Sequence, residues 1–211
     1  MSTPRIVCVM KSGGDYLPEH VAALYRQCLQ YVQGDFYFHC MTDVNLGIAG
    51  VDEVGLEDNL PGWWSKLELF REFDSAFYMD LDTVLVGDIT HMVQPRAGFW
   101  ALRDFGSQRG NPRLGSGVMQ WGRGFRRVYD TFMEAPALHM ERHQRFGDQN
   151  FIERAVDPYG VQYLQDLWPG ALRSYKWDAV PNRLTPETLI ICSRGNPRPW
   201  QVNHHLERHN G

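Results

Sequence analysis

The stretch SAFYMDLDTVLVGDI, residues Ser75–Ile89, decides the fold class of this chain. An apolar run leads into two acidic residues, Asp80 and Asp82, and apolar residues return directly after them. Burying a carboxylate is costly unless a positive group meets it, so the pattern predicts a buried strand end with a cationic partner. In an extended strand Tyr78 and both aspartates would share one face, with the carboxylates about 7 Å apart.

Strand and helix patterns alternate around this stretch. RIVCVM (5–10) and DFYFHCMTD (35–43) predict strands, and PGWWSKLELFREF (61–73) predicts a helix. Another helix, beginning at Pro18, is predicted by apolar residues at the spacing of one helical face: Val21, Leu24, Tyr25, Cys28 and Leu29. This alternation indicates an α/β fold with a mainly parallel sheet flanked by helices.

The second half has less regular patterns. GFWALRD (98–104), LGSGVMQW (114–121) and TLIICS (188–193) predict strands. GFRRVYDTFMEA (124–135) predicts a helix with an apolar face, and DQNFIERAV (148–156) a short helix that begins at Asp148. We expect polar groups to collect between the two halves.

Length and composition point to one globular domain. The chain has 211 residues, 43% hydrophobic and 22% charged, and no apolar run approaches the ~20 residues of a membrane helix. The apolar run among the first residues is too short for a signal peptide, so we expect a cytoplasmic protein without stable membrane insertion. The sequence contains no CxxC pair among its four cysteines, Cys8, Cys28, Cys40 and Cys192. We therefore expect buried reduced thiols and no zinc site.

Charge is uneven along the chain. The net charge is −4, yet residues 96–145 hold nine arginines against four acidic residues, a local charge of +5. Arginines interleaved with aromatic residues suit a polyanion, including DNA, although the overall charge argues against tight nonspecific binding. A solvated basic face is the alternative interpretation.

The acidic strand end suits two chemistries. Two carboxylates at the carboxyl end of a parallel strand are hard ligands for Mn²⁺ or Mg²⁺, as in glycosyl transfer from a nucleotide diphosphate. Asp80, Asp82 and Val84 also match the first motif of haloacid-dehalogenase-like phosphatases. Those enzymes place the motif on the first strand and need a later lysine, for which the chain offers only Lys176. Alternatively, one aspartate caps a turn and the other faces solvent.

Other polar residues leave two interpretations each. Lys66 lies in an apolar helical stripe with Trp63, either as a snorkelling lysine or as a cation aimed at the acidic cleft. The turn GSG (115–117) is either a bulge or a place where backbone approaches a ligand. Asp148 is an N-cap or a site residue, and Asp88 is expected to cap a short helical turn.

Taken in order, six segments resemble GT-A-fold glycosyltransferases. They are CVMKSGGDYLPEHVAALYRQCL, GWWSKLELF, FYMDLDTVLVGDI, LGSGVMQW, GDQNFI and GNPRPWQV. The likeness is to the retaining group that includes glycogenin and lipopolysaccharide galactosyltransferases, and to small bacterial and phage-encoded relatives. It implies a Rossmann-like GT-A domain over residues 1–211, with a nucleotide-binding half (about 1–90) and an acceptor half (about 91–211).

The resemblance also implies roles for individual residues. Asp80 and Asp82 would bind Mn²⁺ (or Mg²⁺) and the diphosphate, and Asp148 and Gln149 would flank the anomeric carbon as catalytic residues. A further set would bind the donor: Val9, Lys11, Asp15, Tyr16, Lys66, Leu81, Ser116, Gly117, Arg194, Gly195 and Arg198. The implied reaction moves a sugar, typically from a UDP-sugar and with retention, to an acceptor glycan or other hydroxyl, with a modified DNA base as another acceptor.

The chain departs from the family pattern near its end. Relatives carry a histidine just before the glycine of the last segment as third metal ligand, whereas Arg194 precedes Gly195 here. The metal could be held by two carboxylates, diphosphate and water. Alternatively His204 or His205 binds it, or Arg194 neutralises the diphosphate. GSG also replaces the usual Asn-Ser-Gly. A non-catalytic nucleotide-sugar binder therefore stays open beside the phosphatase.

Overall fold

The computed structural model describes residues 3–106, 113–180, 183–193 and 195–201. Its first-half elements are β1 (Arg5–Met10), α1 (Pro18–Tyr31), β2 (Tyr37–Thr42), β3 (Asp52–Gly55), η1 (Gly62–Glu68), α2 (Leu69–Glu72), β4 (Ala76–Met79) and β5 (Thr83–Leu85). Its second-half elements are β6 (Phe99–Arg103), β7 (Leu114–Trp121), α3 (Arg126–Glu134), α4 (Pro136–Arg142), α5 (Gly147–Val156), η2 (Asp157–Tyr159), β8 (Val161–Tyr163), α6 (Leu164–Leu167), β9 (Leu172–Ser174), η3 (Tyr175–Ala179), β10 (Ile190–Cys192) and η4 (Pro199–Gln201).

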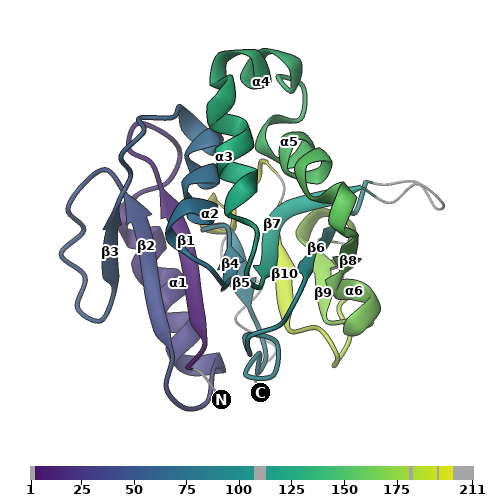
Figure 1. The fold of residues 1–211 in the computed structure, drawn as a ribbon. Helices are drawn as coiled ribbons and strands as arrows, with labels where there is room; N and C mark the ends of the chain where they lie inside the picture. Colours follow the sequence, from purple (N-terminus) through teal and green to yellow (C-terminus); the bar gives the residue numbers. More distant parts are fainter. Residues whose placement is uncertain (1–2, 107–112, 181–182, 194, 202–211) are drawn as a thin grey trace.

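One sheet joins the two halves of the chain. Its seven strands have the order β3-β2-β1-β4-β7-β6-β8, seen from left to right in Figure 1. β1 pairs in parallel with β2 and β4, while β7 is antiparallel to both β4 and β6. A second sheet, β5-β10-β9, brings the end of the chain back beside β5. The predicted mixed, mainly parallel α/β class is confirmed.

Helices cover both faces of the large sheet because side chains alternate along each strand. On β1, Ile6 and Cys8 pack with α1, whereas Val7 and Val9 pack with α2, α3 and α5. In Figure 1, α3 lies in front of the sheet and α1 behind it. The four cysteines are buried and unpaired, as predicted. In the described ranges no helix combines the length and apolarity needed to cross a membrane.

Three local predictions were wrong. The segment predicted as one helix is helical, as a 3₁₀-helix, η1, followed by the short α2, but Trp63, expected on its apolar stripe, is 59% exposed. Leu29, expected on the buried face of α1, is 56% exposed. β4 ends at Met79, and a turn follows in which Thr83 N donates to Asp80 O at 3.0 Å, so Asp80 and Asp82 do not continue an extended strand.

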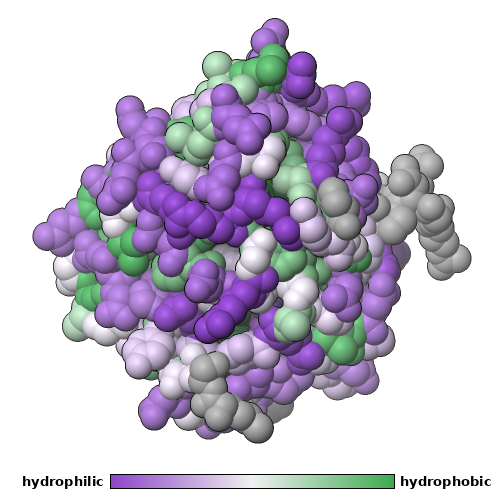
Figure 2. All heavy atoms as spheres, in the orientation of Figure 1, coloured by the Kyte–Doolittle hydropathy of each residue, from purple (hydrophilic) through white to green (hydrophobic). Residues whose placement is uncertain are grey.

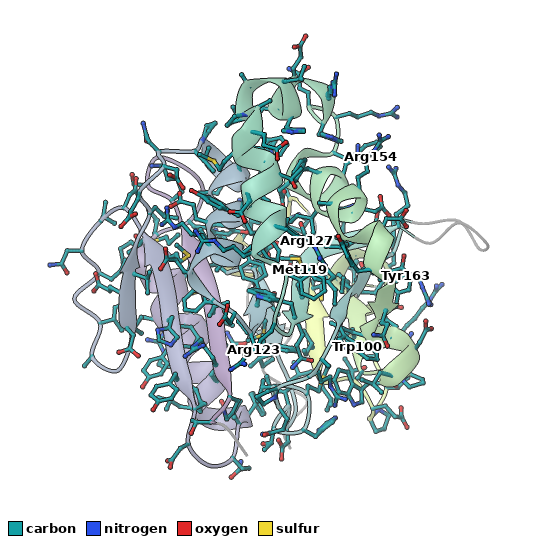
Figure 3. All side chains as sticks on the ribbon, in the orientation of Figure 1. Trp100, Met119, Arg123, Arg127, Arg154 and Tyr163 are labelled. Atoms are coloured by element: carbon teal, nitrogen blue, oxygen red, sulfur yellow. The ribbon has the colours of Figure 1, made fainter. Side chains whose placement is uncertain are left out.

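Two arginines of the arginine-rich middle segment lie on a hydrophilic face of the molecule. Figure 2 shows strongly hydrophilic residues crossing the centre of the face on which α3 lies, and Figure 3 places Arg123 and Arg127 there. Arg127 stacks on Tyr159, and Arg103 on Tyr163. These arginines are therefore partly held by aromatic rings of the same chain.

Candidate active site

A cavity of about 610 Å³ opens at the carboxyl ends of β1 and β4. This position and size are typical of ligand sites in open α/β sheets. Eleven residues that the sequence predicts for the site line it: Val9, Lys11, Asp15, Tyr16, Lys66, Asp80, Ser116, Asp148, Gln149, Gly195 and Arg198. Their segments are far apart in the chain, so the sheet brings the predicted site together.

Lys66 is the positive partner of the acidic strand end. Its Nζ lies 3.0 Å from Asp80 Oδ1 and 3.1 Å from Asp148 Oδ2, and it donates to Ser116 Oγ at 3.2 Å. Burial by itself lowers the pKa of Lys66, but Asp148 and then Asp80 outweigh it and raise the pKa. Lys66 is 6% exposed, so the interpretation as a snorkelling lysine is wrong.

Arg198 is the cation on Asp82. Its guanidinium donates to Asp82 Oδ2 and, at 3.4 Å, to Tyr16 Oη, and it lies 3.3 Å from Asp15 Oδ2. Asp82 is 3% exposed, and burial together with the charge of Asp80 raises its pKa to about 6, against the opposing effect of Arg198. Tyr78 Oη donates to Asp80 Oδ1. Each aspartate of the pair thus has its own cation.

A bulge in β7 shapes the wall beside Asp80. Ala101 pairs with Met119 and Leu102 with Gly115, so the residues between them on β7 bulge away from β6. Within this bulge Gly117 O accepts a hydrogen bond from Asp80 N at 2.8 Å, and a Cβ at position 117 would lie 3.3 Å from Asp80 Oδ2. The interpretation of GSG as a bulge is therefore confirmed, and the bulge brings the backbone of Gly117 close to Asp80.

Asp148 is not an N-cap. It lies in the first turn of α5, where Phe146 holds the cap position and no side-chain cap forms. Its carboxylate accepts from Ser116 Oγ at 2.8 Å besides binding Lys66. The cap interpretation is therefore wrong, because Lys66 and the Ser116 hydroxyl bind this carboxylate. Asp88, in contrast, accepts from Thr90 N at 2.8 Å, as a cap should.

Lys11, which lines the cavity, is paired with a residue that the sequence interpretation missed. Asp43 Oδ2 lies 2.8 Å from Lys11 Nζ, and Asp43 Oδ1 accepts from Ser12 N at 2.7 Å. Burial raises the pKa of Asp43, but the bonds from Lys11 and Ser12 hold it well below its usual value. An available signal was that Asp43 ends the predicted strand 35–43, while Lys11 directly follows the predicted strand 5–10.

Some predicted residues do not line the cavity. Leu81 packs in the hydrophobic core at 4% exposure, Asp82 is buried at 3% exposure, and Gly117 lies against Asp80. Arg194, His204 and His205 lie outside the described residues. Lys176, which the phosphatase alternative needs, is exposed on η3 and does not line the cavity, so the described site does not support that alternative.

No protein-family model matches the sequence, and no curated protein matches it. Similar solved structures are the glycosyltransferase GlyE of Streptococcus pneumoniae TIGR4 (TM-score 0.67, 15% identity, 98% of this chain and 59% of GlyE) and the galactosyltransferase LgtC, crystallised with donor and acceptor sugar analogs (0.67, 13%, 97% and 93%). The bifunctional glycosyltransferase WbbM is also similar (0.60, 14%, 94% and 47%). The chain thus spans less than two thirds of GlyE and WbbM but nearly all of LgtC. The likeness confirms the predicted GT-A fold.

Proposed function

We propose that the chain transfers a sugar from a nucleotide diphosphate donor, a UDP-sugar, to an acceptor hydroxyl with retention of configuration. The observation that carries this proposal is the convergence of Lys66 and Arg198 with three carboxylates at one end of the cavity. A departing diphosphate gains negative charge, and cations placed beforehand stabilise that charge. The glycosyltransferases that share the fold support sugar transfer as the reaction class.

The residues fit a divalent cation. Among the described residues, Asp80, Asp82 and Asp148, together with the exposed Asp15 that also faces Arg198, outnumber the two cations Lys66 and Arg198. Carboxylate oxygens suit Mn²⁺ and Mg²⁺. Asp80 and Asp82 would hold the ion, and it would neutralise the leaving diphosphate. The described part of the chain contains no group of three His, Cys, Asp or Glu that could hold a metal, so diphosphate and water would complete the ligand set.

The protein's own side chains have distinct tasks in this proposal. Arg198 exchanges its bond with Asp82 for a forked contact with the diphosphate, which suits a guanidinium. Lys66 holds the leaving oxygens beside Asp80. Asp148, which is paired with Lys66, stabilises the oxocarbenium-like charge of the sugar, and Gln149 on the next position of α5 orients the acceptor. Lys11 contacts the nucleoside at the other end.

Donor hydrolysis tests the proposal without knowledge of the acceptor. The protein is incubated with a panel of nucleotide sugars, with Mn²⁺ or with a chelator, and free sugar is measured. We expect slow release from at least one donor and a loss of at least about 100-fold in Asp82→Ala. Asp88→Ala is the matched control, because this nearby aspartate only caps a turn. Calorimetric donor binding without any sugar release would identify a non-catalytic binder and contradict transfer.

A further inference from the structure

Two adjacent tryptophans of η1 have opposite environments. Trp64 is 6% exposed and stacks on Phe132 with ring centroids 5.4 Å apart. Trp63 lines the cavity and is 59% exposed, more than any other exposed aromatic side chain of the described residues. A large apolar ring left in solvent at the mouth of a cavity is a feature that typically marks binding.

The Trp63 ring is held in place by glycine. At position 147, which has φ +61°, a Cβ would lie 2.4 Å from Trp63 Nε1 and 2.9 Å from Trp63 Cδ1. The backbone at the start of α5 therefore lies directly against the indole, which a side chain there would displace. Because the ring already packs against the start of α5, a ligand that stacks on it loses little free energy in ordering the protein.

Polar groups surround this apolar ring. Asp148, which directly follows Gly147, is bonded to Lys66 three residues after Trp63, so the ring stands beside the cluster to which we assign the reacting carbon. Arg145 and Gln149 line the same cavity, and Arg145 is exposed. A sugar ring offers a flat C–H face and a rim of hydroxyls, and this combination of an apolar platform with nearby hydrogen-bonding groups is complementary to it.

We propose that Trp63 is the platform for the acceptor and that the acceptor is a saccharide. Its ring stacks on the indole, Arg145 and Gln149 bond its hydroxyls, and one hydroxyl is presented toward Asp148. This inference rests on the proposed function. A nucleic acid acceptor would need several phosphate contacts at this mouth. Four basic residues line the cavity among the described residues, and three of them, Lys11, Lys66 and Arg198, are paired with carboxylates and assigned to the donor, so Arg145 is the one assigned to the acceptor.

Transfer to methyl glycosides of the common hexoses tests this assignment, with a nucleotide sugar that the wild type hydrolyses. We expect Trp63→Ala to raise the acceptor KM about tenfold while kcat falls less, and Trp63→Phe to recover most of the loss, since a phenyl ring still stacks. Tyr37→Ala is the matched control: Tyr37 is 52% exposed and begins β2, at the end opposite the cavity. Melting temperatures check that each variant is folded.

Three outcomes overturn the inference. They are an unchanged acceptor KM in Trp63→Ala, a KM raised equally by Tyr37→Ala, and a wild type that glycosylates a hydroxymethylated oligonucleotide but no methyl glycoside. In each of them donor hydrolysis persists, so the proposed function stands. A wild type that hydrolyses no nucleotide sugar instead overturns the proposed function and the platform together.

Discussion

Two buried ionic clusters grow from one short segment, residues 62–72, and only one of them faces a cavity. In the first, Lys66 binds Asp80 and Asp148. In the second, Arg71 binds Glu68 Oε2 at 3.2 Å and Asp58 Oδ2 at 3.0 Å. The two basic side chains are similarly buried, at 8% and 12% exposure.

The clusters differ in what covers them. Tyr129 of α3 closes the second cluster by donating to Asp58 Oδ2 at 2.8 Å, and Arg71 lies over the Tyr129 ring. Glu68 also accepts from Glu57 N at 2.8 Å, so this cluster ties the loop before η1 to α2 and α3. The first cluster faces the cavity, whereas Tyr129 covers the second cluster. A buried charge therefore indicates a functional site here only together with an open cavity.

Lys66→Met tests whether the first cluster is catalytic, and it has the largest effect that we expect. We expect kcat/KM for donor hydrolysis to fall about 1000-fold, or about 4 kcal/mol, because the leaving diphosphate loses its buried cation. Steady-state hydrolysis of the preferred nucleotide sugar measures this effect, and circular dichroism checks the fold. A Lys66→Met protein with a tenth or more of wild-type activity would refute the catalytic assignment of the first cluster.

Arg71→Met makes the converse test. We expect the free energy of unfolding to fall by about 3 kcal/mol, because Glu68, which is 0% exposed, is left buried without its cation. Well below the melting temperature kcat should stay near the wild-type value, since Arg71 does not line the cavity. Denaturant unfolding measures the free energy of unfolding. Adding Glu68→Gln should recover part of the stability, and an unchanged unfolding midpoint in Arg71→Met would contradict the structural role.

The sequence was sufficient where local patterns determine the structure. β1, α1, β2 and the strand before Asp80 follow from apolar periodicity, and the carboxyl ends of parallel strands place Lys11 and Asp80 in one cavity. The burial and ion pairs of Lys66 could not be predicted from its own segment, because its two carboxylate partners come from the turn after β4 and from α5.

The features that escaped prediction depend on contacts between distant segments. Trp63 sits on an apolar helical stripe in the sequence, yet in the structure it lines the cavity and lies against Gly147, 84 residues away. Asp43 meets Lys11 only because β1 and β2 are neighbours. Arg71 is three residues from its partner Glu68, but the ring of Tyr129 that covers the pair comes from the distant α3.

The smallest effect that we expect is a pH dependence of stability caused by Asp82. The pKa of Asp82 is about 6 in the folded chain against an ordinary value of 3.8, with burial as the largest cause. The folded state therefore holds this proton more tightly than the unfolded state, so the stability that Asp82 contributes is present at low pH and is lost as pH rises through this window. From about pH 4.5 to pH 7 the loss is about 2 kcal/mol.

Asp82→Asn removes this titration, so the variant should gain stability relative to the wild type as pH rises over that range. Denaturant unfolding of both proteins at several pH values measures the difference. Glu68→Gln should show the same sign, because burial also raises the pKa of Glu68 in the cluster without a cavity. If the Asp82→Asn difference shrinks as pH rises, then Arg198 outweighs burial at Asp82. The pair would then resemble an ordinary stabilising salt bridge, and Arg198 would have to break it at a cost to reach the diphosphate.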